Sequence, residues 1–192
     1  MKPITEYILN IENVLSDEIC DKICNNLGTN YFERATTGDN VEDISERNCH
    51  YKRLNKEYEE TNCLMTYGSY IEYPSLKRGK FSKQIPDNII EQQTYRKNQW
   101  MSSHLRTFRY KLWKKINKED FINNKTGNFI KAAWDLAFVF PMLEMCGNRA
   151  HYINDILYMY NRTNPLNEDK INHGLQLSEE DLIRSRKVYK LL

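Results

Sequence analysis

Hydrophobic residues along the chain gather in a few short segments that polar stretches separate. In residues 17–27 the apolar side chains recur every three or four positions, which is the spacing of an amphipathic helix. Ser16 precedes this segment as a favoured N-cap, and Gly28 follows it as a common helix stop. A shorter apolar run at 7–11 has the length of a strand. The pattern therefore predicts a strand and then a helix at the start of the chain.

The next thirty residues are polar, and we place a junction at 56–60 that divides the chain into segments 1–58 and 59–192. Beyond this junction the apolar runs become longer and richer in aromatic residues. The pattern there predicts strands at 63–71, 101–108 and 156–160, and helices at 110–116, 135–145 and from Ser178 onward.

Composition narrows the classes of protein that need to be considered. A chain of 192 residues that is 40% hydrophobic has enough apolar material for the core of one domain, or of one small domain and a fragment of a second. Its longest uncharged apolar run covers residues 136–143, far short of the roughly 20 residues of a membrane span. No apolar segment typical of a signal peptide opens the sequence, and five cysteines are too few for a disulfide scaffold. We therefore expect a cytoplasmic protein.

One block of sequence, Arg96–Lys118, is strongly basic although the formal net charge of the chain is only +2. It contains no Asp or Glu, and aromatic residues alternate with its cations. Such a block is typical of a surface that binds polyanions, where cations contact phosphates and aromatic rings stack on bases. It also suits a pocket for the diphosphate of a nucleotide-sugar. The third interpretation is a solvated basic face whose aromatic rings turn inward.

Two further patterns suggest catalytic chemistry. In an extended strand, His104, Arg106 and Phe108 would lie on one face, where the histidine and arginine could converge on one anionic group. Asp135 stands at the entrance to an apolar helix, where it is either a general base facing a cleft or simply an N-cap. Pro141 lies about six residues into that helix, so we expect a kink or a late helix start.

The cysteines Cys20 and Cys24, with Cys49 and His50 further on, have the residue types of a zinc site. Cys20 and Cys24 fall within the apolar stripe of the predicted first helix, however. We therefore expect buried thiols and no bound metal.

Five stretches between about residues 62 and 170 together resemble the C-terminal half of family-2 glycosyltransferases of the GT-A fold, including the bacterial chondroitin-polymerase type. These stretches are 64–70, 103–108, 134–138, 141–147 and 156–162. The resemblance implies an incomplete GT-A-like α/β half-domain. It covers a little over half of the chain.

The resemblance also implies a reaction, which is inverting transfer of a sugar from a nucleotide-sugar to an acceptor hydroxyl. It makes Asp135 the general base and assigns substrate binding to His104, Arg106, Trp134 and Arg162. The intact family holds Mn or Mg on an Asp-x-Asp motif, but this chain contains no such motif. Some members add a histidine ligand after the segment that ends here at Arg162, where this chain has Thr163. We therefore predict no metal site and little autonomous activity.

Residues 1–55 resemble a different family, the prolyl-hydroxylase-like oxygenases that use 2-oxoglutarate and iron. The matching stretches are 7–16, 20–23, 38–40 and 47–49. The two resemblances together suggest a chimera in which a small N-terminal α+β segment precedes the transferase-like half. Two alternatives stay open: a small basic protein that binds nucleic acid through Arg96–Lys118, and an accessory protein whose fold a partner chain completes.

Overall fold

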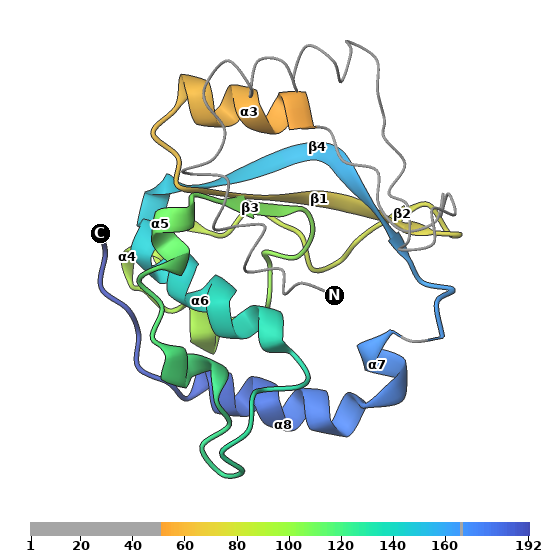
Figure 1. The fold of residues 1–192 in the computed structure, drawn as a ribbon. Helices are drawn as coiled ribbons and strands as arrows, with labels where there is room; N and C mark the ends of the chain where they lie inside the picture. The colour runs from red at the N-terminus through yellow and green to blue at the C-terminus, as the bar shows by residue number, and fades with distance from the viewer. Residues whose placement is uncertain (1–50, 166) are drawn as a thin grey trace, which may run out of the picture. The chain divides into compact units, whose positions relative to one another are not determined.

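The computed structural model of the chain describes residues 51–165 and 167–192, and a mixed four-stranded sheet organises them (Figure 1). Strand β1 (Met65–Tyr73) is central, and β4 (Ala150–Asn161) runs parallel to it along one edge. Two short antiparallel strands share the other edge. These are β3 (Arg106–Phe108), which pairs with the first half of β1, and β2 (Lys77–Arg78), which pairs with the second half.

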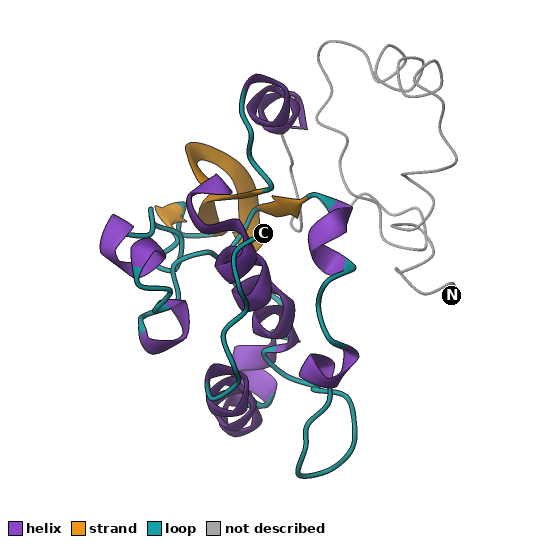
Figure 2. Ribbon diagram, turned by 90° about the vertical axis from the view of Figure 1, so that its left-hand side faces the viewer, coloured by secondary structure: helices purple, strands orange, loops and turns teal. Residues whose placement is uncertain are grey.

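Helices cover both faces of this sheet, as Figures 1 and 2 show. Helix α3 (Tyr51–Glu60) lies over one face, and the two longest helices that follow it, α6 (Trp134–Cys146) and α8 (His173–Arg184), lie on the other. Short helical segments complete the connections: α4 (Asp87–Glu91), η1 (Tyr95–Lys97), α5 (Tyr110–Trp113), η2 (Lys118–Phe121), η3 (Gly147–Arg149) and α7 (Glu168–Ile171).

The central position of β1 explains why its first six residues are all buried. Side chains along a strand alternate between the two faces of its sheet. Met65 and Tyr67 belong to the large core beneath α6, whereas Thr66 bonds to Thr107 of β3. The Thr107 hydroxyl also bonds to that of Tyr58 in α3, at 3.0 Å. Each face of β1 therefore meets its own layer, and the α/β class predicted from the sequence is confirmed.

Helix α6 forms the centre of the larger core. Eleven of its thirteen residues are buried, because the sheet covers one side of it and α8 packs on another. A helix that is apolar on all sides is expected to be enclosed in this way. The prediction of a helix at 135–145 is thus confirmed to within one residue at each end. Pro141 lies inside the helix, so the alternative of a late helix start is wrong.

The other predicted elements agree with the structure to different degrees. The strands at 63–71 and 156–160 are confirmed as β1 and as part of β4. The strand at 101–108 is regular only over its last three residues, because Ser102 forms just an isolated bridge with Ser82. The C-terminal helix begins at His173, five residues before the predicted Ser178. The strand at 7–11 and the helix at 17–27 lie outside the described residues.

Helix α3 runs across the junction predicted from the polar stretch, and the proposed division after residue 58 falls inside it. Its side chains reach the sheet at several points. Arg53 pairs with Asp155 of β4 at 2.8 Å, and Glu57 bonds to His151 of the same strand, also at 2.8 Å. Leu54 packs in a small second core against β4. Residues 51–60 are therefore packed onto the sheet.

Within the part of the chain that the structure describes, no helix combines the length and hydrophobicity that a membrane crossing requires. The cytoplasmic location stays a prediction.

A buried ion pair joins the C-terminal end of α6 to two distant segments. The guanidinium of Arg96 donates to both carboxylate oxygens of Glu144, at 2.5 and 3.0 Å, and to the carbonyl of Ile183 at 2.7 Å. The backbone N–H of Tyr189 donates to the same carboxylate. Burial raises the pKa of Glu144, and the hydrogen bonds from Arg96 oppose that rise. The pair thus holds η1, α6 and the chain after α8 together.

We predict that Arg96→Ala lowers the free energy of unfolding by about 3–5 kcal/mol, because it leaves the Glu144 carboxylate buried without its partner. Chemical denaturation of the full chain measures this change. The neighbouring Lys97 is exposed, so Lys97→Ala should change the free energy by about 0.5 kcal/mol or less. Equal effects of the two substitutions would contradict the prediction.

A second prediction concerns pH and the contact between α3 and the sheet. The hydrogen bond from His151, and then that from Arg53, lower the pKa of Glu57 below its ordinary value of 4.5. A carboxyl with a lowered pKa stabilises the fold above its unfolded-state pKa, and this contribution is lost as the pH falls through the folded-state value. We expect Glu57→Gln to cost about 1 kcal/mol or less at pH 7.

The difference between wild type and Glu57→Gln should shrink steadily as the pH falls below 4.5. Denaturation curves for both proteins from pH 7 to pH 3 measure it. The exposed Glu59 is the matched control, since Glu59→Gln should show no such trend. A difference that grows in acid would contradict the prediction.

Candidate functional site

An ion pair links the first turn of α6 to the start of β3. Arg106 Nη1 donates to Asp135 Oδ2 at 2.7 Å, and the two residues are 29 positions apart in the sequence. The Arg106 side chain is 11% exposed and that of Asp135 is 31% exposed. The guanidinium carbon of Arg106 also lies 5.9 Å from the centre of the Trp100 ring, within the range of a cation–π contact. The fold thus places a cation and a solvent-accessible carboxylate side by side.

The structure corrects the alternative interpretation of Asp135 as a helix N-cap. The residue at the cap is Ala133, which has a φ of +53°, and no side chain bonds to the first turn as a cap. Asp135 instead lies inside the first turn, where the helix dipole favours a negative charge. Its carboxylate accepts a hydrogen bond from Arg106, and the residue at the cap, Ala133, has the left-handed conformation.

Trp134, the first residue of α6, borders the same carboxylate in the sequence and is 54% exposed. Its ring packs at a tilt against Phe138, one turn along the helix, with 5.8 Å between ring centres. Most large aromatic residues in the described part of the chain are buried or half-buried. An exposed indole beside Asp135 therefore provides an apolar surface next to a hydrogen-bonding group.

His104 lies in a cluster of tyrosines. Its ring stacks on Tyr158 and Tyr160, with ring centres 4.7 and 5.3 Å away, and meets Tyr70 edge-on at 5.8 Å. The guanidinium of Arg162 lies 5.7 Å from the centre of the Tyr160 ring. This cluster therefore brings together the ends of β1 and β4 with the segment that leads into β3.

The five residues predicted for the site thus form two groups. In the first group, Arg106 at the start of β3 pairs with Asp135, which follows Trp134 at the start of α6. In the second, His104 and Arg162 both contact the ring of Tyr160. The groups are linked through the chain, since only Leu105 separates His104 from Arg106. The resemblance also implies that Asp135 and His104 face a common cleft, and this stays a prediction.

The basic block Arg96–Lys118 separates into arginines that bond to other parts of the protein and lysines that are exposed. Arg96 and Arg106 are ion-paired, and Arg109 donates to the carbonyls of Cys63 and Tyr58. The aromatic rings of the block pack inward: Trp100 on Phe140, Phe108 on Phe138, and Trp113 on Phe121 and Phe138. This arrangement favours the interpretation of a solvated basic face.

The residues present do not fit the divalent metal of the intact glycosyltransferase family. The sequence has no Asp-x-Asp motif, and no cluster of three or more His, Cys, Asp or Glu among the described residues could hold an ion. Cys63 and Cys146 are buried free thiols, and burial raises the pKa of both. Cys20, Cys24, Cys49 and His50 lie outside the described residues.

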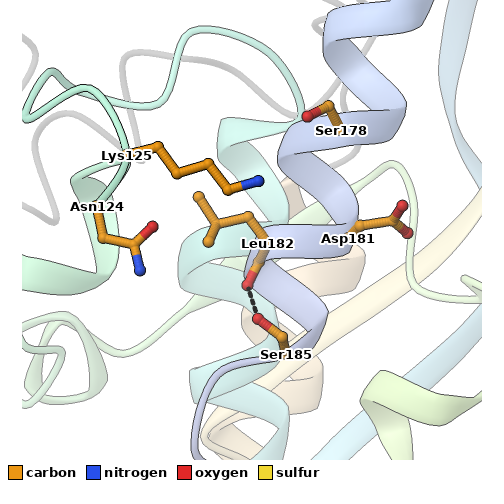
Figure 3. A pocket seen from close by; sticks show the side chains of 6 residues that line it. All are labelled: Asn124, Lys125, Ser178, Asp181, Leu182 and Ser185. Atoms are coloured by element: carbon orange, nitrogen blue, oxygen red, sulfur yellow. Dashed lines mark hydrogen bonds between the residues drawn. The ribbon is translucent and has the colours of Figure 1, made fainter.

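An open groove of about 730 Å³ runs between the loop at 123–128 and helix α8 (Figure 3). Lys125 extends past Leu182 in this view, and the Ser185 hydroxyl bonds to the Leu182 carbonyl. Residues lining the groove are Asn124, Lys125, Ser178, Asp181, Leu182 and Ser185. None of these is among the predicted site residues.

Sequence reasoning missed one residue next to the site, Glu179 of α8. Its carboxylate accepts hydrogen bonds from the backbone N–H groups of Lys131 and Ala132, at 2.9 and 2.7 Å, just before α6 begins. The available signal was its spacing from the fully buried Ile183, because residues four apart share one face of a helix.

Comparisons with known proteins add no further constraint: no family model matches the chain, and no curated protein or solved structure matches it.

Proposed function

We propose that residues 62–170 are the base-bearing half of an inverting family-2 glycosyltransferase of the GT-A type. The observation that carries the proposal is the ion pair between Arg106 and Asp135. It joins two stretches, 103–108 and 134–138, that each resemble this family and lie apart in the sequence. A phosphate-binding cation beside an accessible carboxylate is what transfer from a nucleotide-sugar needs.

In the proposed reaction, Asp135 accepts the proton of the acceptor hydroxyl while the hydroxyl oxygen forms a bond to the anomeric carbon. The bond from that carbon to the diphosphate oxygen breaks on the opposite side of the sugar ring, and the diphosphate leaves with the bonding electrons. A positioned base of this kind contributes roughly 10²- to 10⁴-fold to the rate. Configuration at the anomeric carbon is inverted because attack and departure are on opposite faces.

The remaining site residues would bind the two substrates. Arg106 uses one nitrogen for Asp135, and a guanidinium has further N–H donors that can bond to diphosphate oxygens. Trp134 offers an exposed ring to the apolar face of a sugar. His104 and Arg162 would contact the substrate from the tyrosine cluster.

Charge on the departing diphosphate limits what this chain does alone. Metal ions that stabilise such a leaving group contribute several kcal/mol in enzymes that use them. Arg106 is already paired with Asp135, and the described residues contain no metal-binding cluster. We therefore propose weak binding of nucleoside diphosphates and little transfer by the isolated chain, with a partner chain completing the donor site.

The test is calorimetric binding of uridine diphosphate to the full chain, together with a transfer assay using UDP-sugars and manganese. Arg106→Gln should weaken diphosphate binding at least about tenfold, since it removes a charge-assisted hydrogen bond. Lys125→Gln, in the groove of Figure 3, is the matched control and should bind like wild type. Absence of binding to the wild-type chain would contradict the proposal.

The transfer assay tests the second part of the proposal. We expect turnover near background for the wild-type chain and for Asp135→Asn. Robust turnover that disappears in Asp135→Asn would confirm the reaction and refute the requirement for a partner chain.

A second candidate function is nucleic-acid binding through the basic face. The observation that favours it is a set of exposed lysines within one block: Lys97, Lys111, Lys114, Lys115 and Lys118. Binding to phosphates alone would depend steeply on salt concentration. Oligonucleotide binding with such a salt dependence, and none to uridine diphosphate, would favour this function over sugar transfer.

A further inference from the structure

Glu179 is a buried carboxylate whose hydrogen bonds all go to one segment of the chain. Glu179 is 3% exposed, and its carboxylate accepts hydrogen bonds from the backbone N–H groups of Lys131 and Ala132. It also accepts one from Asn123 Nδ2, at 3.2 Å. A buried charge without such partners would be strongly unfavourable. Helix α8 therefore holds the segment 123–132 through one side chain.

That segment leads directly into the candidate site. Ala133 follows Ala132 with a φ of +53°, and α6 begins at the next residue. A left-handed conformation costs a residue with a side chain about 1–2 kcal/mol, so it persists only where the surroundings enforce it. Glu179 supplies that enforcement, because it bonds the two N–H groups immediately before Ala133.

We propose that Glu179 is a positioning residue for Asp135. By fixing the backbone at 131–132 it fixes where α6 begins, and so directs the Asp135 carboxylate toward Arg106. Glu179 itself has no hydrogen bond to either member of that pair. The catalytic role of Asp135 rests on the function proposed above. The positioning of Asp135 by Glu179 is independent of that function.

A second buried glutamate, Glu144, provides an internal comparison. Glu144 lies near the C-terminal end of α6 and bonds to Arg96 and to the backbone of Tyr189. It thus secures the end of the helix that is remote from the site. Loss of Glu179 should therefore disturb the Arg106–Asp135 pair and leave the Arg96–Glu144 pair intact.

The experiment compares Glu179→Gln with wild type in the full chain by nitrogen-15 NMR. Glutamine keeps the shape but has one acceptor oxygen, and it turns an NH₂ group toward backbone donors. We expect amide exchange at Lys131 and Ala132 to accelerate at least tenfold. Exchange of the Arg106 guanidinium protons should accelerate by a similar factor, and that of the Arg96 guanidinium should not change.

Glu180→Gln is the matched control, because Glu180 is partly exposed and pairs with Arg184, one turn along the same helix. It should leave all three exchange rates as in wild type. Faster exchange at 131–132 with an unchanged Arg106 would overturn the proposal, since Glu179 would then support only its own segment.

If Glu179→Gln does not fold, Asn123→Ala tests the same proposal with a less disruptive change. It removes one of the three donors to Glu179 and leaves α8 unaltered. We expect exchange at Lys131, Ala132 and Arg106 to accelerate about two- to fivefold together, and acceleration of the first two alone would refute the proposal. Neither readout involves a nucleotide or a sugar, so failure of the proposed function would not alter this result.

Discussion

Helix α6 is apolar on every side, and this constraint determines most of the architecture. Such a helix is stable only when other elements shield it from water on every side. The sheet packs on one side of α6, and α8 with the following segment packs on another. Glu144 is buried together with the apolar residues, and its charge would destabilise the fold without an oppositely charged partner. Arg96 is that partner, and its bonds to Glu144 and to the carbonyl of Ile183 join η1 and the end of α8 to the same core.

The same constraint defines where function can reside on this helix. Only at its first turn does α6 reach solvent, and there it carries Trp134 and Asp135. That turn follows the left-handed Ala133 and the segment whose N–H groups bond to Glu179. The accessible end of the helix is thus placed by contacts that lie outside the helix.

Local sequence patterns predicted the helices and strands that contain an unbroken run of buried residues. The apolar run of α6 and the strands β1 and β4 could be recognised because each has its own hydrophobic signal. Strand β3 was predicted too long, since its pairing with β1 covers only three residues and depends on distant parts of the chain. The sequence placed Arg106 and Asp135 among the site residues by resemblance, but it gave no indication that they pair. For Glu179 the local signal was weak: it lies four residues before the apolar Ile183, but a glutamate in a polar helix is expected to be exposed.

The two carboxylates of α6 differ in how far solvent and substrates can reach them. Glu144 is wholly buried, and both its oxygens bond to Arg96, so no substrate can reach it. Asp135 is nearly one-third exposed, and the structure records a bond from Arg106 to one of its oxygens. A general base has to approach the proton that it removes within hydrogen-bonding distance. Of the two carboxylates, only that of Asp135 is accessible enough to meet that requirement.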